Sequence, residues 1–367
     1  MKYHNPTGAT LTPKFIIRAD SYKEIGTGHI VRCLALAEQF KVSGGDVTVV
    51  SHCESDFLID QILSVGCEFI PLTCTFPNQI DLQTTLSVIK NSSEAKYHYI
   101  WTILDGYQFD SEYQQKIMQS DCNLMVIDDS AHQGYYHTNV LLNQNLGANN
   151  IDYVCDPHTT MLLGSKYTLL RSQFTREKIR TRFIPKTATK ILVTMGGSDK
   201  YNLTSKIIQS IQNIPANKLE VLAVVGTSNS NFNDIQETAK VSQVPVKIVR
   251  ETDEMPDLMT WADLAISAAG STTWELSFMG TPMILVVTED NQISIADQMT
   301  KFEAAHAIES RPQLDLKELL NKVSYLISNS NERERMSERC WNLVDGDGCK
   351  RVIDNLAIVQ ASDRSEI

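Results

Sequence analysis

The chain has 367 residues, of which 42% are hydrophobic and 21% charged, and its formal net charge is −11. This length and apolar content predict two globular domains and argue against extensive disorder. The acidic balance argues against a nucleic-acid-binding protein, which needs a basic face. It does not argue against an anionic small ligand, because a few local groups can hold one.

Neither a membrane span nor a disulfide framework is predicted. No apolar run reaches the roughly 18 residues that a spanning helix needs. Residues 1–14 lack the apolar segment of a secretory signal and are interpreted as a short N-terminal extension. The eight cysteines are scattered without a Cys-x-x-Cys pair. This favours buried free thiols in a reducing cytoplasm over disulfides or zinc.

Residues 15–40 combine a short apolar run, a polar loop with two glycines and an amphipathic helix. Phe15–Ile17 predict a buried strand, and apolar residues then recur at helical spacing as far as Phe40. The helix should start near Gly28 or His29. Its first N–H groups lack intrahelical partners and carry the positive end of the helix dipole, so they can seat an anion.

Four polar side chains surround this strand-to-helix loop, namely Arg18, Asp20, His29 and Arg32. A Gly-x-Gly turn or a histidine at a helix start is often only structural, and for each residue alone that interpretation stays open. Ordinary packing does not require four such groups around one loop. The combination therefore favours a ligand-binding or catalytic site.

The motif Arg-Ala-Asp-(x)4-Ile-Gly-Thr-Gly-His-(x)2-Arg that starts at Arg18 resembles the N-terminal signature of the PseG family. These enzymes are UDP-2,4-diacetamido-2,4,6-trideoxy-β-L-altropyranose hydrolases of pseudaminic acid biosynthesis. The resemblance implies that His29 is the catalytic residue. The substrate contacts that it implies in this loop are Arg18, Asp20, Gly28 and Arg32.

Strands and helices alternate through the first half of the chain. Strands are predicted at 46–51, 67–71, 99–105, 123–129 and 140–143, and helices at 55–65, 81–90 and 111–119. Such alternation predicts a parallel sheet covered by helices on both faces. Asp20, Asp105, Asp128 and Asp129 fall at strand ends, where ligands bind in such sheets. Each alone is more often a cap or turn residue.

Residues 162–174 resemble the family's Gly-x-x-Tyr-x-x-Leu-Arg-x-x-Phe element, which makes Arg171 a predicted ligand contact. The alternative is a surface arginine with a packed stem. Residues 176–189 are basic and are broken by Pro185, so we interpret them as an interdomain linker.

A second strand, glycine loop and helix begin at Lys190. Gly196 and Gly197 precede a predicted helix at 202–212, whose free amides can hold phosphate. Further strands are predicted at 219–225 and 246–249, and helices at 233–240, 255–261, 293–302, 316–328 and 332–343.

Residues 267–282 resemble the element Ser-x-x-Gly-Ser-x-x-x-Glu-Leu followed by Gly-x-Pro, which the PseG family shares with the glycosyltransferase MurG. In that wider group the fold is GT-B, an α/β class with two Rossmann-like domains whose parallel sheets face across a cleft. The resemblance implies that Ser271 and Thr272 contact phosphate and that Glu275 holds the UDP ribose. A helix cap at Ser271 and a dipole partner at Glu275 are the alternatives.

Asn291 and Gln292 match the family's Asn-Gln pair, which implies a contact with the sugar or the diphosphate. The predicted organisation is an N-terminal extension at 1–14, a Rossmann-like domain with the catalytic histidine at 15–175, a linker at 176–189, a UDP-binding Rossmann-like domain at 190–345 and a C-terminal helix at 346–367.

Taken together, the resemblance implies hydrolysis of the anomeric C–O bond of a UDP-sugar, with inversion and release of UDP. His29 would act as general base, because an imidazole with an ordinary pKa near 6.5 accepts a proton at neutral pH. No cofactor, nucleic-acid partner or membrane partner is predicted, and no Asp-x-Asp or His-rich cluster demands a metal. A GT-B glycosyltransferase with a UDP-sugar donor and a non-catalytic nucleotide-sugar-binding protein remain open. The oligomeric state is not predicted.

Overall fold

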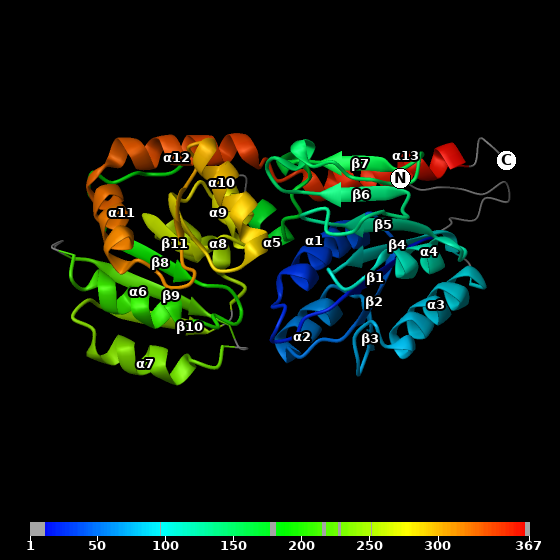
Figure 1. Ribbon diagram of the computed structural model, residues 1–367, viewed down its shortest axis with the longest axis horizontal. Coiled ribbons are helices and arrows are strands. Elements are labelled where there is room, and N and C mark those ends of the chain that lie inside the picture. Colours follow the sequence, from blue (N-terminus) through cyan, green and yellow to red (C-terminus); the bar gives the residue numbers. More distant parts are fainter. Residues whose placement is uncertain are drawn as a thin grey trace. The chain divides into compact units, whose positions relative to one another are not determined.

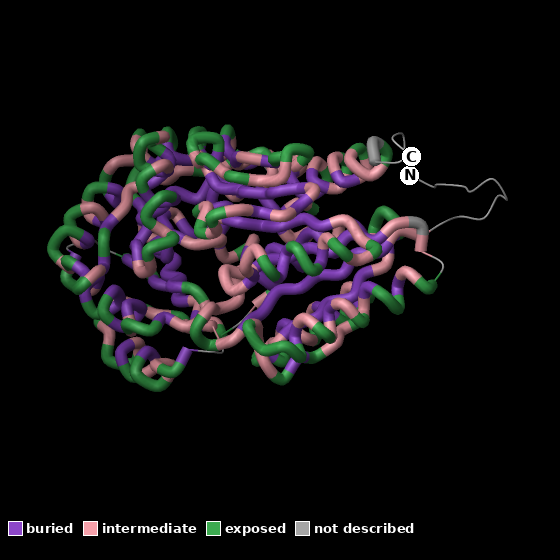
Figure 2. The backbone as a smooth tube through the Cα atoms, turned by 45° about the vertical axis from the view of Figure 1, so that its right-hand side comes forward, coloured by how far each residue is buried: buried purple, intermediate pink, exposed green. Residues whose placement is uncertain are grey.

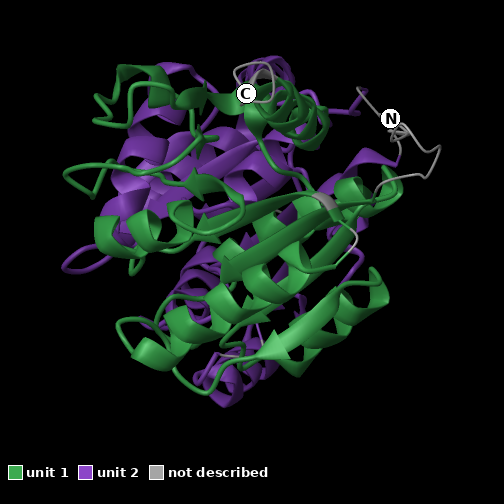
Figure 3. Ribbon diagram, turned by 90° about the vertical axis from the view of Figure 1, so that its right-hand side faces the viewer, with its two compact units in different colours: residues 1–172, 347–367 green, residues 173–346 purple. Residues whose placement is uncertain are grey.

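The computed structural model describes residues 12–95, 97–176, 181–214, 218–226, 229–250 and 252–363. The chain divides into two compact units, residues 1–172 with 347–367 and residues 173–346, which Figure 3 colours separately. The C-terminal helix α13 (Gly348–Asp363) belongs to unit 1, where it contacts α1 (Gly28–Val42). Most of the predicted N-terminal extension lies outside the described residues.

Unit 1 is built on a seven-stranded sheet in the order β3-β2-β1-β4-β5-β6-β7, and every neighbouring pair is parallel (Figure 1). Its strands are β1 (Thr12–Ala19), β2 (Asp46–Ser51), β3 (Glu68–Pro71), β4 (Tyr97–Asp105), β5 (Asn123–Ile127), β6 (Val140–Asn143) and β7 (Thr160–Leu163). Besides α1 and α13, its helices are α2 (Asp56–Ser64), α3 (Gln79–Ser93) and α4 (Ser111–Met118). Short 3-10 turns lie at Ala148–Asn150 and Ser165–Tyr167.

Unit 2 contains a second parallel sheet in the order β10-β9-β8-β11-β12-β13. Its strands are β8 (Lys190–Thr194), β9 (Glu220–Val225), β10 (Val246–Arg250), β11 (Leu264–Ala268), β12 (Met283–Val287) and β13 (His306–Glu309). Its helices are α6 (Leu203–Ile211), α7 (Phe232–Val241), α8 (Met255–Trp261), α9 (Thr272–Phe278), α10 (Ile293–Lys301), α11 (Leu316–Ser328) and α12 (Ser330–Leu343). The short helix α5 (Ser172–Thr175) spans the boundary between the units.

Both sheets reverse their strand order at one place, between β1 and β4 in unit 1 and between β8 and β11 in unit 2. In open parallel sheets the loops at the carboxyl ends of the strands separate at such a switch point and leave room for a ligand. The loop after β1 leads directly to His29, and β4 ends at Asp105. The fold therefore places His29 and Asp105, two polar residues noted in the sequence, at the switch point of the first sheet.

Helices cover both faces of the first sheet because its strands are apolar on both sides. Phe15 and Ile17 of β1 pack with α1, whereas Ile16 between them belongs to a different cluster that includes Ile89 of α3 and Tyr113 of α4. Figure 2 shows the central strands as buried along most of their length. Alternate residues of one strand thus fill two separate cores.

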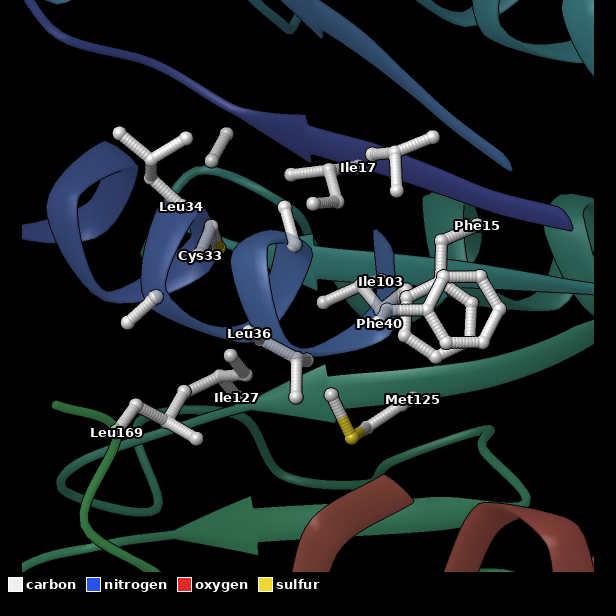
Figure 4. Packing of buried hydrophobic residues seen from close by; sticks show 14 of the residues in the cluster. Phe15, Ile17, Cys33, Leu34, Leu36, Phe40, Ile103, Met125, Ile127 and Leu169 are labelled. Carbon is white, nitrogen blue, oxygen red and sulfur yellow. The ribbon is translucent and has the colours of Figure 1, made fainter. Parts of the chain in front are cut away.

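The apolar face predicted for the first helix is confirmed. α1 begins at Gly28, and Ile30, Cys33, Leu34 and Phe40 are all buried. Figure 4 shows this face lying against β1, with the ring of Phe40 stacked on Phe15. Burying a side chain of this size contributes about 1.5–3 kcal/mol, so the face holds the helix in place at the edge of the site.

The other predicted elements are found with shifts of a few residues at their ends, and α8 and α11 have the predicted bounds. Two short strands, β7 and β13, were not predicted. All eight cysteines are free in the structure. Among the described residues no helix is long and apolar enough to cross a membrane.

Candidate active site

The charged residues of unit 1 meet because neighbouring strands end at the same level. Ala19 of β1 pairs with Asp105 of β4, and Asp105 pairs with Ile127 of β5. The loops that follow these three strands therefore start side by side. They bring His29 and Arg32 of α1 next to Asp105, and Arg32 also next to Asp129, which follows β5.

His29 forms a dyad with a buried carboxylate. Its Nδ1 lies 2.6 Å from Oδ1 of Asp105, whose side chain is fully buried, whereas His29 itself is 9% exposed. A carboxylate only accepts hydrogen bonds, so Nδ1 must carry the proton. In the neutral ring Nε2 is then the atom with a free lone pair, which is the form required of a general base.

Arg32 keeps Asp105 ionised. Its Nε and Nη2 each lie 2.6 Å from one oxygen of Asp105, and its Nη1 donates to Asp129 at 2.9 Å. Burial by itself raises the pKa of Asp105, but the adjacent Arg32 and His29 outweigh burial and hold that pKa well below its usual range. The histidine therefore faces a permanent negative charge.

Tyr107 contacts both Asp129 and His29. Its hydroxyl donates to Asp129 at 3.1 Å, and its ring meets the His29 ring edge to face at a centroid distance of 5.2 Å. The sequence Asp105-Gly106-Tyr107 resembles family positions, so sequence reasoning pointed to this strand end, but it assigned Tyr107 no contact of its own. The available signal was its position two residues after the end of a buried strand.

Arg18 and Asp20 lie in a separate buried network. Arg18 Nη1 lies 2.5 Å from Asp20 Oδ1, and Arg18 Nε donates to Asp81 of α3 at 3.1 Å. Burial lowers the pKa of Arg18, but the two carboxylates raise it above its ordinary value. Tyr113 also donates to Asp81, at 2.9 Å. Neither Arg18 nor Asp20 is exposed, so this geometry favours a supporting role over the predicted substrate contact, which stays untested.

Gly28 and Arg171 also belong to unit 1. Gly28 is the first residue of α1 and is half-buried. Arg171 is half-buried and follows the buried Leu170, directly before α5. Their predicted contacts with substrate stay predictions.

In unit 2 the loop after β8 contains Gly196, which is exposed with a φ of +77°, and Gly197. A Cβ at Gly226 would lie 2.5 Å from the carbonyl oxygen of Gly197, so the loops after β8 and β9 touch through their backbones. Asp199 caps α6 by accepting hydrogen bonds from the N–H groups of residues 203 and 204, at 2.8 and 2.9 Å. Those two amides are engaged, whereas Gly196 in the same loop is exposed.

The opening of α9 differs from that of α6. Ser271 occupies the predicted N-cap position, but its side chain makes no capping hydrogen bond. Among the described residues, the N–H groups of Ser271 and Thr272 have no hydrogen-bond partner, whereas that of Thr273 binds the carbonyl of Gly270. Glu275, one turn further on, is 9% exposed. This loop therefore offers backbone donors next to a mostly buried carboxylate.

Asn291 and Gln292 form a 3-10 turn after β12. Asn291 is exposed. The side-chain oxygen of Gln292 accepts hydrogen bonds from the N–H and the hydroxyl of Thr288, at 2.8 and 3.1 Å. This use of Gln292 holds the turn, so Asn291 is the more accessible of the two predicted contacts.

Residues 191–350 match the family model of the glycosyltransferase family 28 C-terminal domain. The chain is 25% identical to the UDP-2,4-diacetamido-2,4,6-trideoxy-β-L-altropyranose hydrolase of Campylobacter jejuni over 78% of its own length and 96% of the relative. It is 23% identical to the spore coat polysaccharide biosynthesis protein SpsG of Bacillus subtilis over 96% of this chain and 99% of the relative. Identity to the uncharacterized protein MJ1062 of Methanocaldococcus jannaschii is 24% over 78% of this chain, which spans only 58% of that relative.

The crystal structure of MurG from Acinetobacter baumannii is similar to this chain with a TM-score of 0.64 at 14% identity, over 95% of this chain and all of MurG. At that identity the likeness concerns the fold alone. It agrees with the two parallel sheets described above and confirms the predicted α/β, GT-B-like class.

Proposed function

We propose that this chain, a relative of the PseG hydrolases that carries a glycosyltransferase family 28 C-terminal domain, hydrolyses a UDP-linked sugar. The substrate proposed is UDP-2,4-diacetamido-2,4,6-trideoxy-β-L-altropyranose or a close analogue, as in pseudaminic acid biosynthesis. The bond broken is the anomeric C–O bond, and the products are UDP and the free sugar. The proposal assigns water activation to unit 1 and UDP binding to unit 2.

The observation that carries the proposal is the His29–Asp105 dyad at the switch point of the first sheet. A histidine with one nitrogen on a buried carboxylate has its second nitrogen available to a water molecule. When that nitrogen takes a proton, the ionised Asp105 stabilises the imidazolium that forms, as the aspartate does in hydrolytic triads. Arg32 holds Asp105 ionised and in place.

In the proposed reaction, water attacks the anomeric carbon from the side opposite the diphosphate and gives its proton to His29 Nε2. The C–O bond electrons leave with the β-phosphate of UDP. Attack opposite the leaving group inverts the anomeric centre. No cofactor or metal ion is needed to balance these steps.

The leaving diphosphate gains negative charge, so donors placed near it stabilise the transition state. The backbone amides of Ser271 and Thr272 supply such donors, and the glycine loop at Gly196–Gly197 lets phosphate approach the backbone closely. Glu275 would accept hydrogen bonds from the two ribose hydroxyls.

The first test is the fate of oxygen from labelled water. Turnover of the UDP-sugar in H₂¹⁸O should place the label in the sugar and leave released UDP unlabelled, and EDTA should not change the rate. Label in UDP would show attack at phosphorus and would contradict the proposal.

The second test is the variant His29→Asn. The control is His137→Asn, which replaces a histidine that lies outside the dyad. His29→Asn should bind UDP-sugar with little change but lose turnover by about 10²-fold to 10⁴-fold, the usual contribution of a general base. The control should retain turnover, because His137 pairs with Asp156 at 3.2 Å and not with Asp105.

A glycosyltransferase is the second candidate, because the matched family model is named for that activity. It would pass the sugar to an acceptor hydroxyl instead of water. UDP release measured with and without a panel of sugar and lipid-linked acceptors separates the two functions. A rate that depends on an added acceptor would favour transfer.

A further inference from the structure

A second histidine–aspartate pair lies in the loop after β5, outside the residues assigned above. Asp128 Oδ1 accepts hydrogen bonds from the N–H groups of Ser130 and Ala131, at 2.9 and 2.6 Å. Ala131 adopts a left-handed conformation with a φ of 53°. This tight turn brings His132 back over Asp128, so that His132 Nδ1 lies 2.5 Å from Asp128 Oδ2.

Both ring nitrogens of His132 face hydrogen-bond acceptors. Nδ1 faces the carboxylate of Asp128, and Nε2 lies 3.1 Å from the backbone carbonyl of Tyr107. The ion pair with Asp128 favours the imidazolium, and Nε2 must carry a proton because the Tyr107 carbonyl can only accept. Burial lowers the pKa of His132, but the bond to Asp128 outweighs burial and leaves that pKa raised.

Tyr107 connects this pair to the proposed catalytic dyad. Its ring lies between two imidazoles, 5.2 Å from the His29 ring and 5.3 Å from the His132 ring, each meeting it edge to face. Its hydroxyl donates to Asp129, and its carbonyl accepts from His132. Tyr107 is therefore held at both its backbone and its hydroxyl. Its ring contacts His29, the proposed general base.

We propose that His132 is a positioning residue for the reaction proposed above: as a cation paired with Asp128 it donates to the Tyr107 carbonyl and holds Tyr107, and through the Tyr107 ring it limits the orientations of His29. This inference rests on the proposed function. A purely structural His132 would stabilise its own turn without changing the ring of His29.

The groups that face His132 come from its own loop and from the neighbouring strand ends. They are Asp128, Asp129, Tyr107 and Tyr136, and Tyr153 donates a hydrogen bond to Asp128. The pKa of Asp128 is lowered because hydrogen bonds from His132 and two backbone amides outweigh burial, and burial raises the pKa values of Tyr136 and Tyr153. These three groups therefore keep one charge state near neutral pH, while His132 changes its own.

The direction of the pH effect follows from the raised pKa. His132 is charged below that pKa and loses its proton as the pH rises through it, so the support to Tyr107 is present at lower pH and weakens on the alkaline side. A glutamine amide can donate to both acceptors without titrating. His132→Gln should therefore retain turnover and lose the alkaline decline of kcat that His132 causes.

Two readouts test the inference on the full-length protein. In ¹⁵N-histidine NMR, wild type should show both His132 nitrogens protonated at pH 6.5, and His132→Phe should shift or broaden the His29 ring signals. In UDP-release assays, His132→Phe should lower kcat by about tenfold with little change in KM, because orientation and not binding is lost. His132→Gln should restore most of kcat.

His137→Phe is the matched control, because His137 lies on the same segment and pairs with Asp156. It should leave both readouts unchanged. Unchanged His29 signals in His132→Phe, a neutral His132, or an unchanged kcat would overturn the inference. If wild type releases no UDP, the proposed function fails by itself, and the NMR arm still decides whether His132 positions His29.

Discussion

The two sheets have different kinds of residue at their switch points. At the switch point of unit 1, charged side chains form buried ion pairs, with Asp105 joined to His29 and Arg32. At the switch point of unit 2, the loops contain glycines that approach one another through the backbone, with Gly226 against Gly197. A proton-accepting group needs fixed charges around it, whereas phosphate needs close backbone and free amides. This contrast is consistent with the proposal that unit 1 activates water and unit 2 binds UDP.

Asp105→Asn in unit 1 should have the largest effect on turnover among the variants considered. Asp105→Asn removes the negative charge that pairs with His29 and Arg32. The proton of His29 is then no longer held on Nδ1, and Arg32 loses its main ion-pair partner. Turnover should fall by about 10³-fold or more, and the free energy of unfolding should fall by about 3 kcal/mol. UDP-release rates and urea unfolding measure the two effects. Asp156→Asn is the control, and turnover within twofold of wild type in Asp105→Asn would refute the dyad.

Arg18→Met tests whether Arg18 supports the fold of unit 1 or contacts the substrate. It leaves the carboxylates of Asp20 and Asp81 buried without their cation, so the free energy of unfolding should fall by about 3–5 kcal/mol while KM stays near the wild-type value. If the variant does not fold, the triple change that adds Asp20→Asn and Asp81→Asn should recover part of the stability. A raised KM with unchanged stability would instead support the substrate contact expected from the sequence.

Two alanine substitutions sharpen the contrast in unit 2. Gly226→Ala places a Cβ against the Gly197 carbonyl and should lower the free energy of unfolding by about 1–3 kcal/mol. A Cβ at Gly270 meets no atom within 4 Å, so Gly270→Ala should change stability by less than about 0.5 kcal/mol. It should nevertheless raise KM, because the methyl group stands where phosphate would approach. Equal KM values for Gly270→Ala and wild type would move the phosphate away from this loop.

The smallest expected effect concerns the turn that supports His132. Ala131 has a φ of 53°, which costs an alanine about 1–2 kcal/mol, whereas glycine in its place loses about 0.5–1 kcal/mol of chain entropy. Ala131→Gly should therefore stabilise the protein by about 0.5 kcal/mol in urea unfolding, with kcat unchanged. A loss of more than 1 kcal/mol would mean that the alanine methyl group is needed for packing.

Much of the local structure followed from the sequence. Apolar periodicity predicted α1 with its start near Gly28 or His29, and the predicted bounds of α8 and α11 agree with the structure to the residue. α1 and α11 are predictable because each buries an apolar face along its length. β7 and β13 were missed because each has one buried residue, Leu162 and Ile308 respectively, and therefore shows no buried apolar run.

The sequence by itself determined which polar residues follow strand ends, since a buried strand must give way to a polar loop where it leaves the core. Only the tertiary structure decided which of them meet. The register of β1 and β4 brings Asp105 to His29, 76 residues earlier, and α3 brings Asp81 to Arg18, 63 residues earlier. Pairing across such distances depends on how strands and helices pack, and no local pattern encodes it.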